Sequence, residues 1–410
     1  MKEVYYFSIN ELDLTIQNTE IVSIRKKDIG KTGVRAYGDG KISIVGGLGE
    51  VSEKKLYEQA LGALSTGIPY PYEPERDKIR KEKVISPELM ENEAFMPEVE
   101  KILSFLRKEY NDFTFFHKAK LIENERELRN ESGVDLFHSV RYVSLQFAFK
   151  SKDKSNIMDG YIGYEGKDFD GEAFIKHAVE ILEGYRNTVD FPGKGTYPLI
   201  FLESDQLPLQ KLTQDLHGSI FGTGGSPLSG QLDQQVFSSD FTLYQTGNPE
   251  DTFAPFFDSE GVTNDGDRYP LIRNGKIISP YTDKKISGRF ELPLTGCAGG
   301  DYDDVPTLSI PGLKVASSGK SLKELLNHEP GIFVLICAGG DFTPDGNFGS
   351  PVQLAFLHDG TRIIGRLPEL KISSKLKEMF GPSFRGLSVD TFFPLARDKF
   401  LVMDMEADLL

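Results

Sequence analysis

The sequence predicts an α+β protein, with an N-terminal α+β region of hairpins and amphipathic helices over residues 1–190 and a β-rich C-terminal domain over 195–410. Three observations support this prediction. Apolar residues alternate with period two in some segments of the first half and recur at helical spacing in others. The second half holds most of the glycine, which is typical of short strands joined by tight turns. Proline and two glycines at 191–195 mark the boundary.

The N-terminal region is expected to contain two units, about 1–70 and 93–190. In the first unit, strands at 32–37 and 42–45 flank Gly38-Asp39-Gly40, which supplies the positive-φ positions of a hairpin turn. A helix should follow the N-cap residue Ser52, with one apolar face formed by Leu56, Ala60, Leu61 and Leu64.

Residues 67–92 are rich in proline and then in charge, and we interpret them as a connector. The second unit should contain a helix after Pro97, with its apolar stripe at Val99, Ile102, Leu103 and Leu106. Strands that alternate through 145–149 follow a turn at 130–133, and a second helix follows the N-cap residue Asp170. This order of strand, turn, strand and helix favours an α+β unit.

The C-terminal domain is expected to begin with an apolar strand at 197–202 and a helix at 205–217 that leads into a glycine loop. A later helix starts at a capping box, Ser321 with Glu324, and ends before Pro330-Gly331. Residues 332–337 then read as a buried strand.

Composition excludes several functional classes. Lys and Arg number 47 against 62 Asp and Glu, a formal net charge of −15, and no basic run is longer than Arg25-Lys26-Lys27. Direct nucleic-acid binding is therefore not expected, because duplexes are held mainly by cations. The first residues do not have the pattern of a signal peptide, so we expect none. No apolar run reaches membrane-spanning length, and the two cysteines, Cys297 and Cys337, cannot form a disulfide framework. We expect a cytoplasmic protein without membrane contact.

Local catalytic motifs are missing from the sequence. Gly319-Lys320-Ser321 lacks the earlier glycine of a phosphate loop, since Lys314 occupies that position. No nucleophile elbow surrounds Ser226, and no two histidines lie closer than about 20 residues, which excludes a helix-borne HExxH zinc motif. The acidic clusters do not fit a calcium loop and are interpreted as solvated turns.

The glycine-rich segments 222–225 and 339–340 could present backbone amides to a peptide or an anion, and tight turns in a β-rich domain are the alternative. We predict no catalytic residue and no metal ligand. The candidates for a peptide-binding groove are His217, Gly222, Gly224, Gly225, Asp258, Glu260, Gly261, Gly339 and Gly340.

Short motifs in a conserved order give the chain a family resemblance. Residues 256–263, FFDSEGVT, followed by 271–277, LIRNGKI, resemble a signature of the TldD/PmbA family, whose members are called modulators of DNA gyrase. Further segments resemble family motifs in the same order along the chain: Gly33-Val34-Arg35 with Asp39-Gly40, 295–298, 310–312, 321–326, 331–334 and 346–350.

This resemblance implies an α+β N-terminal region, a β-rich C-terminal domain, dimeric assembly and a role in cytosolic proteolysis or peptide maturation. The TldD branch resembles metallopeptidases, with HExxxH on the helix after the first C-terminal strand. Here residues 207–215 read LPLQKLTQD and carry no HExxxH. The family's third zinc ligand, a cysteine, is matched by Val334 or Leu335, and Cys337 comes a few residues late. The chain therefore resembles the PmbA (TldE) branch.

We accordingly expect a metal-free subunit with no cofactor of its own. Zinc would be held by a TldD-type partner that carries HExxxH, and a homodimer is the alternative assembly. The ligand would be an unfolded or modified peptide. Two other functions stay open: a stand-alone homodimeric peptidase with a metal site assembled from distant residues, or a non-catalytic regulatory protein that acts through other proteins. Distant ligands would come from His217, His328, Cys337 or Asp341.

Overall fold

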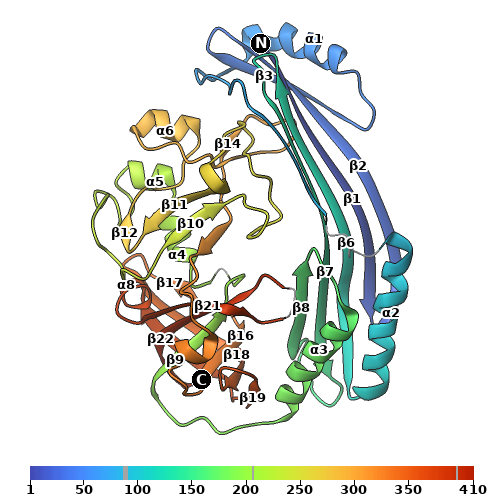
Figure 1. Ribbon diagram of the computed structural model, residues 1–410, viewed down its shortest axis with the longest axis vertical. Coiled ribbons are helices and arrows are strands. Elements are labelled where there is room, and N and C mark those ends of the chain that lie inside the picture. Colours follow the sequence, from blue (N-terminus) through green and yellow to red (C-terminus); the bar gives the residue numbers. More distant parts are fainter. Residues whose placement is uncertain (86–90, 206, 394–395) are drawn as a thin grey trace.

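A computed structural model describes residues 1–85, 91–205, 207–393 and 396–410, in which a long curved N-terminal sheet faces a β-rich C-terminal body (Figure 1). The sheet has the strand order β4-β3-β2-β1-β6-β7-β5, and β8 also pairs with β7. Its strands are β1 (Lys2–Gln17), β2 (Glu20–Gly38), β3 (Lys41–Leu48), β4 (Ile68–Pro69), β5 (Ile79–Val84), β6 (Phe113–Asn130), β7 (Asp135–Ser151) and β8 (Gly160–Gly166). The α+β class is confirmed.

Three helices pack on this sheet, α1 (Glu53–Ala63) at one end and α2 (Asn92–Glu109) and α3 (Gly171–Arg186) at the other (Figure 1). The apolar stripe of α2 is fully buried, at Phe95, Val99, Ile102, Leu103 and Leu106. Each such side chain contributes roughly 1.5–3 kcal/mol by leaving water. The carboxylate of Asp170 accepts the N–H groups of Glu172 and Ala173, so the predicted N-cap of α3 is confirmed.

The predicted hairpin and its helix are also confirmed, with one correction. Strands β2 and β3 pair up to Gly38 and Lys41, and the turn between them has positive φ at Asp39 and Gly40. Ser52 caps α1 by accepting the Lys55 N–H. Leu61, however, is 50% exposed, because α1 buries only a narrow face against β2 and β3.

The prediction that residues 67–92 are only a connector is wrong, because two strands of the long sheet, β4 and β5, lie within this segment. Residues 86–90 of the segment lie outside the described residues. Strand β4 pairs with β3, and β5 pairs in parallel with β7. The charged sequence of β5, IRKEKV, does not resemble a buried strand. Charged side chains are typical of edge strands, which are held by backbone pairing with a neighbour rather than by burial of their side chains.

The C-terminal body is built on a closed ring of strands. The order is β16-β9-β22-β20-β18, and a further pairing between β16 and β18 closes it. The bounds are β9 (Gly195–Leu202), β16 (Gly331–Cys337), β18 (Asn347–His358), β20 (Leu370–Lys375) and β22 (Lys399–Leu409), with β17 (Asp341–Phe342), β19 (Ile363–Arg366) and β21 (Phe384–Thr391) attached. The strands predicted at 197–202 and 332–337 are confirmed as β9 and β16.

A smaller sheet stands beside the ring, nearer the α1 end of the long sheet (Figure 1). Its order is β12-β11-β10-β15, and β13 and β14 form a separate ribbon. These strands are β10 (Leu243–Thr246), β11 (Arg268–Arg273), β12 (Lys276–Ile277), β13 (Ala298–Gly299), β14 (Thr307–Leu308) and β15 (Leu313–Val315). Short helices complete the body: α4 (Gln210–Asp215), α5 (Gly218–Gly222), α6 (Lys284–Phe290), α7 (Leu322–Leu325) and α8 (Leu376–Met379).

The helix predicted at 205–217 is wrong in extent, and its residue 206 lies outside the described residues. The Asp205 side chain caps the Leu207 N–H in a turn, and helix geometry is kept only in α4. His217 has extended backbone and is the N-cap of α5, so the chain turns there. The capping box of Ser321 and Glu324 is confirmed, and α7 ends early because Asn327 and His328 adopt positive φ. In the described parts of the chain, no helix has both the length and the apolarity to cross a membrane.

Candidate functional site

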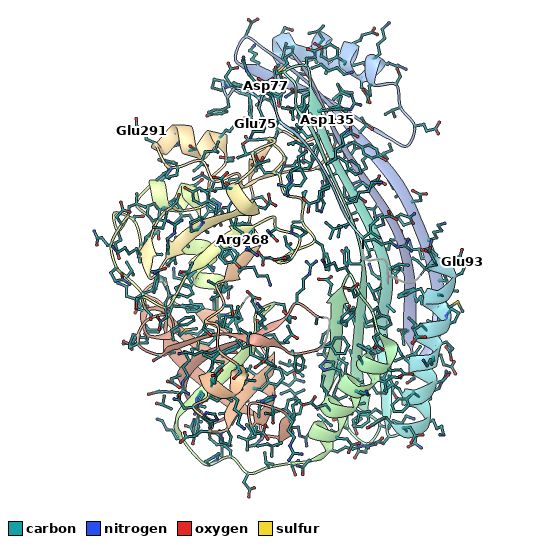
Figure 2. All side chains as sticks on the ribbon, in the orientation of Figure 1. Glu75, Asp77, Glu93, Asp135, Arg268 and Glu291 are labelled. Atoms are coloured by element: carbon teal, nitrogen blue, oxygen red, sulfur yellow. The ribbon has the colours of Figure 1, made fainter. Side chains whose placement is uncertain are left out.

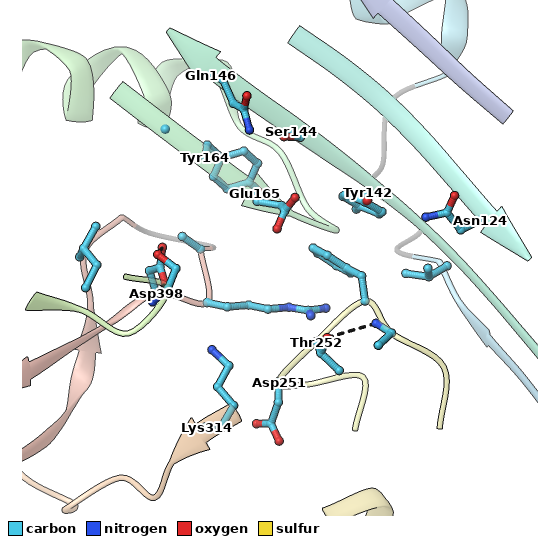
Figure 3. Close-up of a pocket in the computed structure, with 18 of the residues that line it drawn as sticks. Asn124, Tyr142, Ser144, Gln146, Tyr164, Glu165, Asp251, Thr252, Lys314 and Asp398 are labelled. Carbon is cyan, nitrogen blue, oxygen red and sulfur yellow. Dashed lines mark hydrogen bonds between the residues drawn. The ribbon is translucent and has the colours of Figure 1, made fainter. Parts of the chain in front are cut away.

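A cleft lies between the long sheet and the C-terminal body. Its main cavity has a volume of about 660 Å³. In Figure 3 the side chains of Asn124, Tyr142 and Glu165 project from β6, β7 and β8 into this space. Asp251, Lys314 and Asp398 approach from the opposite side, on segments of the body. Both halves of the fold therefore build the walls of one cavity.

Aromatic and cationic side chains stack across this cavity. The ring of Tyr142, on β7, lies parallel to that of Phe253, on the body, with centroids 4.1 Å apart and an interplanar angle of 8°. The guanidinium of Arg397 lies 3.7 Å from the Phe253 centroid. Flat aromatic surfaces such as these bind apolar and planar groups well.

The polar groups of the cavity are mostly paired. Arg268 donates to both carboxylate oxygens of Asp251, at 2.6 and 2.9 Å, and Lys314 lies 3.0 Å from Glu203. Partial desolvation by the cavity walls raises the pKa of the Glu165 carboxyl and raises that of Tyr142 to about 12. Four lining residues carry buried polar atoms that have no hydrogen-bond partner among the described residues: the terminal nitrogens of Arg397, Oδ1 of Asn124, both ring nitrogens of His138 and the hydroxyl of Tyr164.

Three smaller cavities adjoin the main one through shared lining residues. One of them, with a volume of about 550 Å³, shares Tyr161 and Leu335 with the main cavity and is also lined by Gly339 and Gly340. A second cavity shares Ala254 with the main one and has Asp258 among its lining residues. A third continues past Arg397 to a set of charged side chains: Arg268, Lys314, Lys399, Glu203 and Glu250. The cleft is thus a groove longer than its main cavity.

The structure brings some of the predicted groove residues to this cleft and leaves others away from it. Gly339 and Gly340 line the adjoining cavity at the end of β16. His217 does not line these cavities, and its ring packs edge-on against Tyr281 with centroids 5.4 Å apart. Gly222 ends α5 against the ring of Phe290.

The amides of the 222–225 segment are already used within the fold. The N–H of Gly224 donates to the carbonyl of Phe221, and that of Gly225 donates to Ile220. These bonds close the C-terminal end of α5. A role of His217, Gly222, Gly224 and Gly225 in peptide binding stays a prediction.

Asp258, Glu260 and Gly261 form a buried turn that joins the body to the upper end of the long sheet. Asp258 accepts the N–H groups of Glu260, Val262 and Ala298. Glu260 accepts the hydroxyl of Tyr70 and the N–H of Lys284, and burial raises its pKa to about 7. Gly261 has a φ of +77°, which favours glycine.

A buried ion pair completes this contact. Arg35 is 0% exposed, and its Nη1 lies 3.1 Å from Glu3 and donates to the Ser259 carbonyl at 2.6 Å. Nearby, Lys284 pairs with Glu75 at 2.8 Å, and Figure 2 shows Glu75 where sheet and body meet. We call this set the joint: Glu3, Arg35, Tyr70, Glu75, Ser259, Glu260 and Lys284.

The donor set does not fit a zinc site. Helix α4 carries Lys211 and Asp215, a buried ion pair with a separation of 2.5 Å. Within the described ranges, no three His, Cys, Asp or Glu side chains are grouped so that they could hold a metal ion. Burial raises the pKa of Cys337 to about 11 and that of Cys297 as well, so both thiols are protonated at neutral pH.

Comparison with known proteins places this architecture in a class. Residues 194–398 match the family model described as the PmbA/TldA metallopeptidase C-terminal domain. The class is therefore that of metallopeptidase-related proteins with a β-rich C-terminal domain. The chain belongs to the TldD/PmbA family, so the resemblance found in the sequence is confirmed.

Solved structures share the whole fold. TldE from Thermococcus kodakarensis superposes with a TM-score of 0.81 at 18% identity, covering 99% of this chain and 96% of that one. A protein of Thermotoga maritima, described as a "putative modulator of a DNA gyrase", has a TM-score of 0.78 at 17% identity, with 98% and 95% covered. A protein of Bacteroides thetaiotaomicron with a similar description has a TM-score of 0.75 at 14% identity, with 100% and 94% covered. No curated protein matches the chain in sequence.

Sequence reasoning missed the main cavity. Tyr142, Glu165, Phe253 and Arg397 come from segments far apart in the chain, and none belongs to a recognisable motif. One weak signal was available, since the apolar run Phe253-Ala254-Pro255 follows the acidic pair Glu250-Asp251 after a single threonine. An exposed aromatic in a polar loop is a feature of binding surfaces.

Proposed function

We propose that this chain is a metal-free subunit of the PmbA (TldE) type that binds unfolded or modified peptide in cytosolic proteolysis or peptide maturation. The observation that carries the proposal is the cleft, a groove of joined cavities between sheet and body. Its main cavity of about 660 Å³ is within the range of ligand sites, and its walls are both aromatic and polar. Such walls suit a chain of varied side chains better than one small metabolite.

Strand β8 offers a means of holding an extended peptide. Among the described strands it pairs only with β7, so its second edge has unpaired backbone groups. Tyr161, Gly163 and Glu165 of β8 line the main cavity. An extended peptide can add to such an edge through backbone hydrogen bonds, which accept many sequences.

Peptide hydrolysis would need a second chain. The described part of α4 offers no imidazole and no free carboxylate pair to activate water, because Lys211 and Asp215 neutralise each other. We propose that a TldD-type subunit with HExxxH supplies the zinc, with a homodimer as the alternative assembly. Val22 and Ile24 on one face of β2 are 52% and 54% exposed, and an exposed apolar face supports a subunit contact.

Two matched glycine variants test peptide binding. Gly339 and Gly224 both have positive φ and open space around the position of a Cβ, but only Gly339 lines the groove. Valine at either position strains the backbone similarly. We expect Gly339→Val to weaken binding of a fluorescent unstructured peptide at least about tenfold, and Gly224→Val to bind as the unchanged protein does.

Fluorescence anisotropy measures the affinity, and thermal unfolding verifies that both variants fold. Equal binding by all three proteins would place the peptide elsewhere. No binding by any of them would contradict the proposed function and favour a regulatory role through folded proteins.

A further inference from the structure

The cleft contains a cation, Arg397, that forms no hydrogen bond to a carboxylate among the described residues. Both terminal nitrogens of Arg397 are shielded from solvent, and neither donates to an acceptor in the described ranges. Burial lowers the pKa of this guanidinium, although Glu165 and Asp251 raise it from a distance. A buried charge that lacks hydrogen bonds costs several kcal/mol, so a folded protein seldom keeps one without a use.

Two neighbouring cations, Arg268 and Lys314, are paired with carboxylates. Asp251 accepts two hydrogen bonds from Arg268 and one from the Thr246 hydroxyl, and Glu203 pairs with Lys314. Both of these carboxylates are therefore occupied. Among the described residues, the close contact of the Arg397 guanidinium is the aromatic face of Phe253.

The position of Arg397 suits a ligand that enters from the groove. It lines both the main cavity and the charged cavity beside it. Phe253 is itself stacked on Tyr142, so the guanidinium rests on a two-ring platform between sheet and body. Lys399, which lines the charged cavity, also has no carboxylate partner within the described ranges.

We propose that Arg397 binds the carboxylate of a peptide held in the cleft. This proposal rests on the proposed function, since it names the group by which that site anchors its peptide. The planar guanidinium matches a carboxylate with two parallel hydrogen bonds. Glu165 and Asp251 stand nearby, and they disfavour a doubly charged phosphate more than a singly charged carboxylate.

The carboxylate has two sources, the C-terminus of the peptide or an acidic side chain. Three labelled hexapeptides of neutral residues separate these sources: one with a free C-terminus, one with a C-terminal amide, and one amide with an internal glutamate. The variant Arg397→Met removes the charge and keeps the chain length. Arg362→Met is the matched control, because Arg362 is 77% exposed on its side chain and outside the groove.

We expect the free-acid peptide to bind the unchanged protein and the Arg362→Met variant at least about tenfold more tightly than the plain amide, as a hydrogen bond to a charged group implies. In Arg397→Met this preference should vanish. The variant should unfold at the same temperature as the unchanged protein or a higher one, because no described partner loses a bond. Recovery of tight binding by the glutamate-containing amide would identify the site as one for any carboxylate.

A small probe separates failure of this proposal from failure of the proposed function. N-acetyl-phenylalanine and its amide differ only in the carboxylate. If no peptide binds but the acid raises the unfolding temperature of the unchanged protein and not of Arg397→Met, the carboxylate site stands and the peptide groove fails. If peptides bind with equal affinity in acid and amide form, the groove stands and the role of Arg397 is wrong. If neither peptides nor the probe bind, both are wrong.

Discussion

Glutamine in place of Glu3 should destabilise the protein strongly, because it leaves Arg35 charged and buried inside the joint. Glu3 is 1% exposed and Arg35 is 0% exposed. Glu3 also accepts the hydroxyl of Tyr37 at 2.9 Å and the amide of Asn130 at 3.2 Å. Glutamine keeps the shape and one acceptor but removes the counter-charge. Breaking a buried ion pair from one side costs about 3–5 kcal/mol, against a total stability of about 5–15 kcal/mol.

Urea unfolding at pH 7 measures this loss. Glu131→Gln is the matched control, since Glu131 is exposed and caps only the Lys2 N–H, and it should change the free energy of unfolding by less than about 0.5 kcal/mol. The double variant with Arg35→Met removes both charges and should regain part of the loss. A change below about 1 kcal/mol in Glu3→Gln, or a double variant less stable than Glu3→Gln, would refute the reasoning.

Three further predictions concern the pH response, a helix cap and the cleft. Burial raises the pKa of Glu260 to about 7, above its value near 4.5 in the unfolded chain. Because the folded protein therefore binds the proton more tightly, the free energy of unfolding should fall as the pH rises from about 5 to 8. Glu260→Gln should flatten this decline in urea unfolding at four pH values, and a flat profile in the unchanged protein would count against it. Ser321→Ala should cost about 1 kcal/mol by removing the capping box of α7, whereas Lys320→Ala, at an exposed neighbour, should cost under about 0.5 kcal/mol in the same assay. Phe253→Ala should weaken peptide binding about threefold to tenfold, since it removes the ring stacked on Tyr142, and unchanged affinity would exclude this stack from the site.

Features set by short-range chemistry could be predicted from the sequence. The turn at Gly38-Asp39-Gly40, the caps at Ser52 and Asp170, and the capping box at Ser321 depend on residues within four positions of each other, and the structure has all of them. The family motif at 256–263 could also be recognised from the sequence, because its residues are contiguous.

Features set by long-range pairing could not be predicted in the same way. Strand β5 looks like a connector because its order comes from pairing with β7, more than fifty residues away. The joint also depends on residues far apart in the chain, since Arg35 donates a hydrogen bond to the carbonyl of Ser259. Asp258 and Glu260 stand out in the sequence as a motif, but only the structure shows that Asp258 binds backbone amides within the body and that Glu260 contacts Tyr70 on the side of the long sheet.

The cleft was the hardest feature to predict. Tyr142 and Phe253 meet as stacked rings although they belong to different halves of the chain, and Arg397 joins them from near the C-terminus. Glycine-rich loops suggested a groove, yet only Gly339 and Gly340 of those loops line one. Composition and spacing carry no information on which surfaces face each other after folding.

The central claim is that this chain binds peptide and leaves metal chemistry to a partner. The most direct test counts the zinc in the purified chain and follows cleavage of an unfolded peptide by the chain alone and after addition of a TldD-type HExxxH protein from the same genome. The account predicts substoichiometric zinc and no cleavage by the chain alone, and chelator-sensitive cleavage by the mixture that exceeds that of the partner alone. One zinc per chain together with cleavage by the chain alone would contradict it.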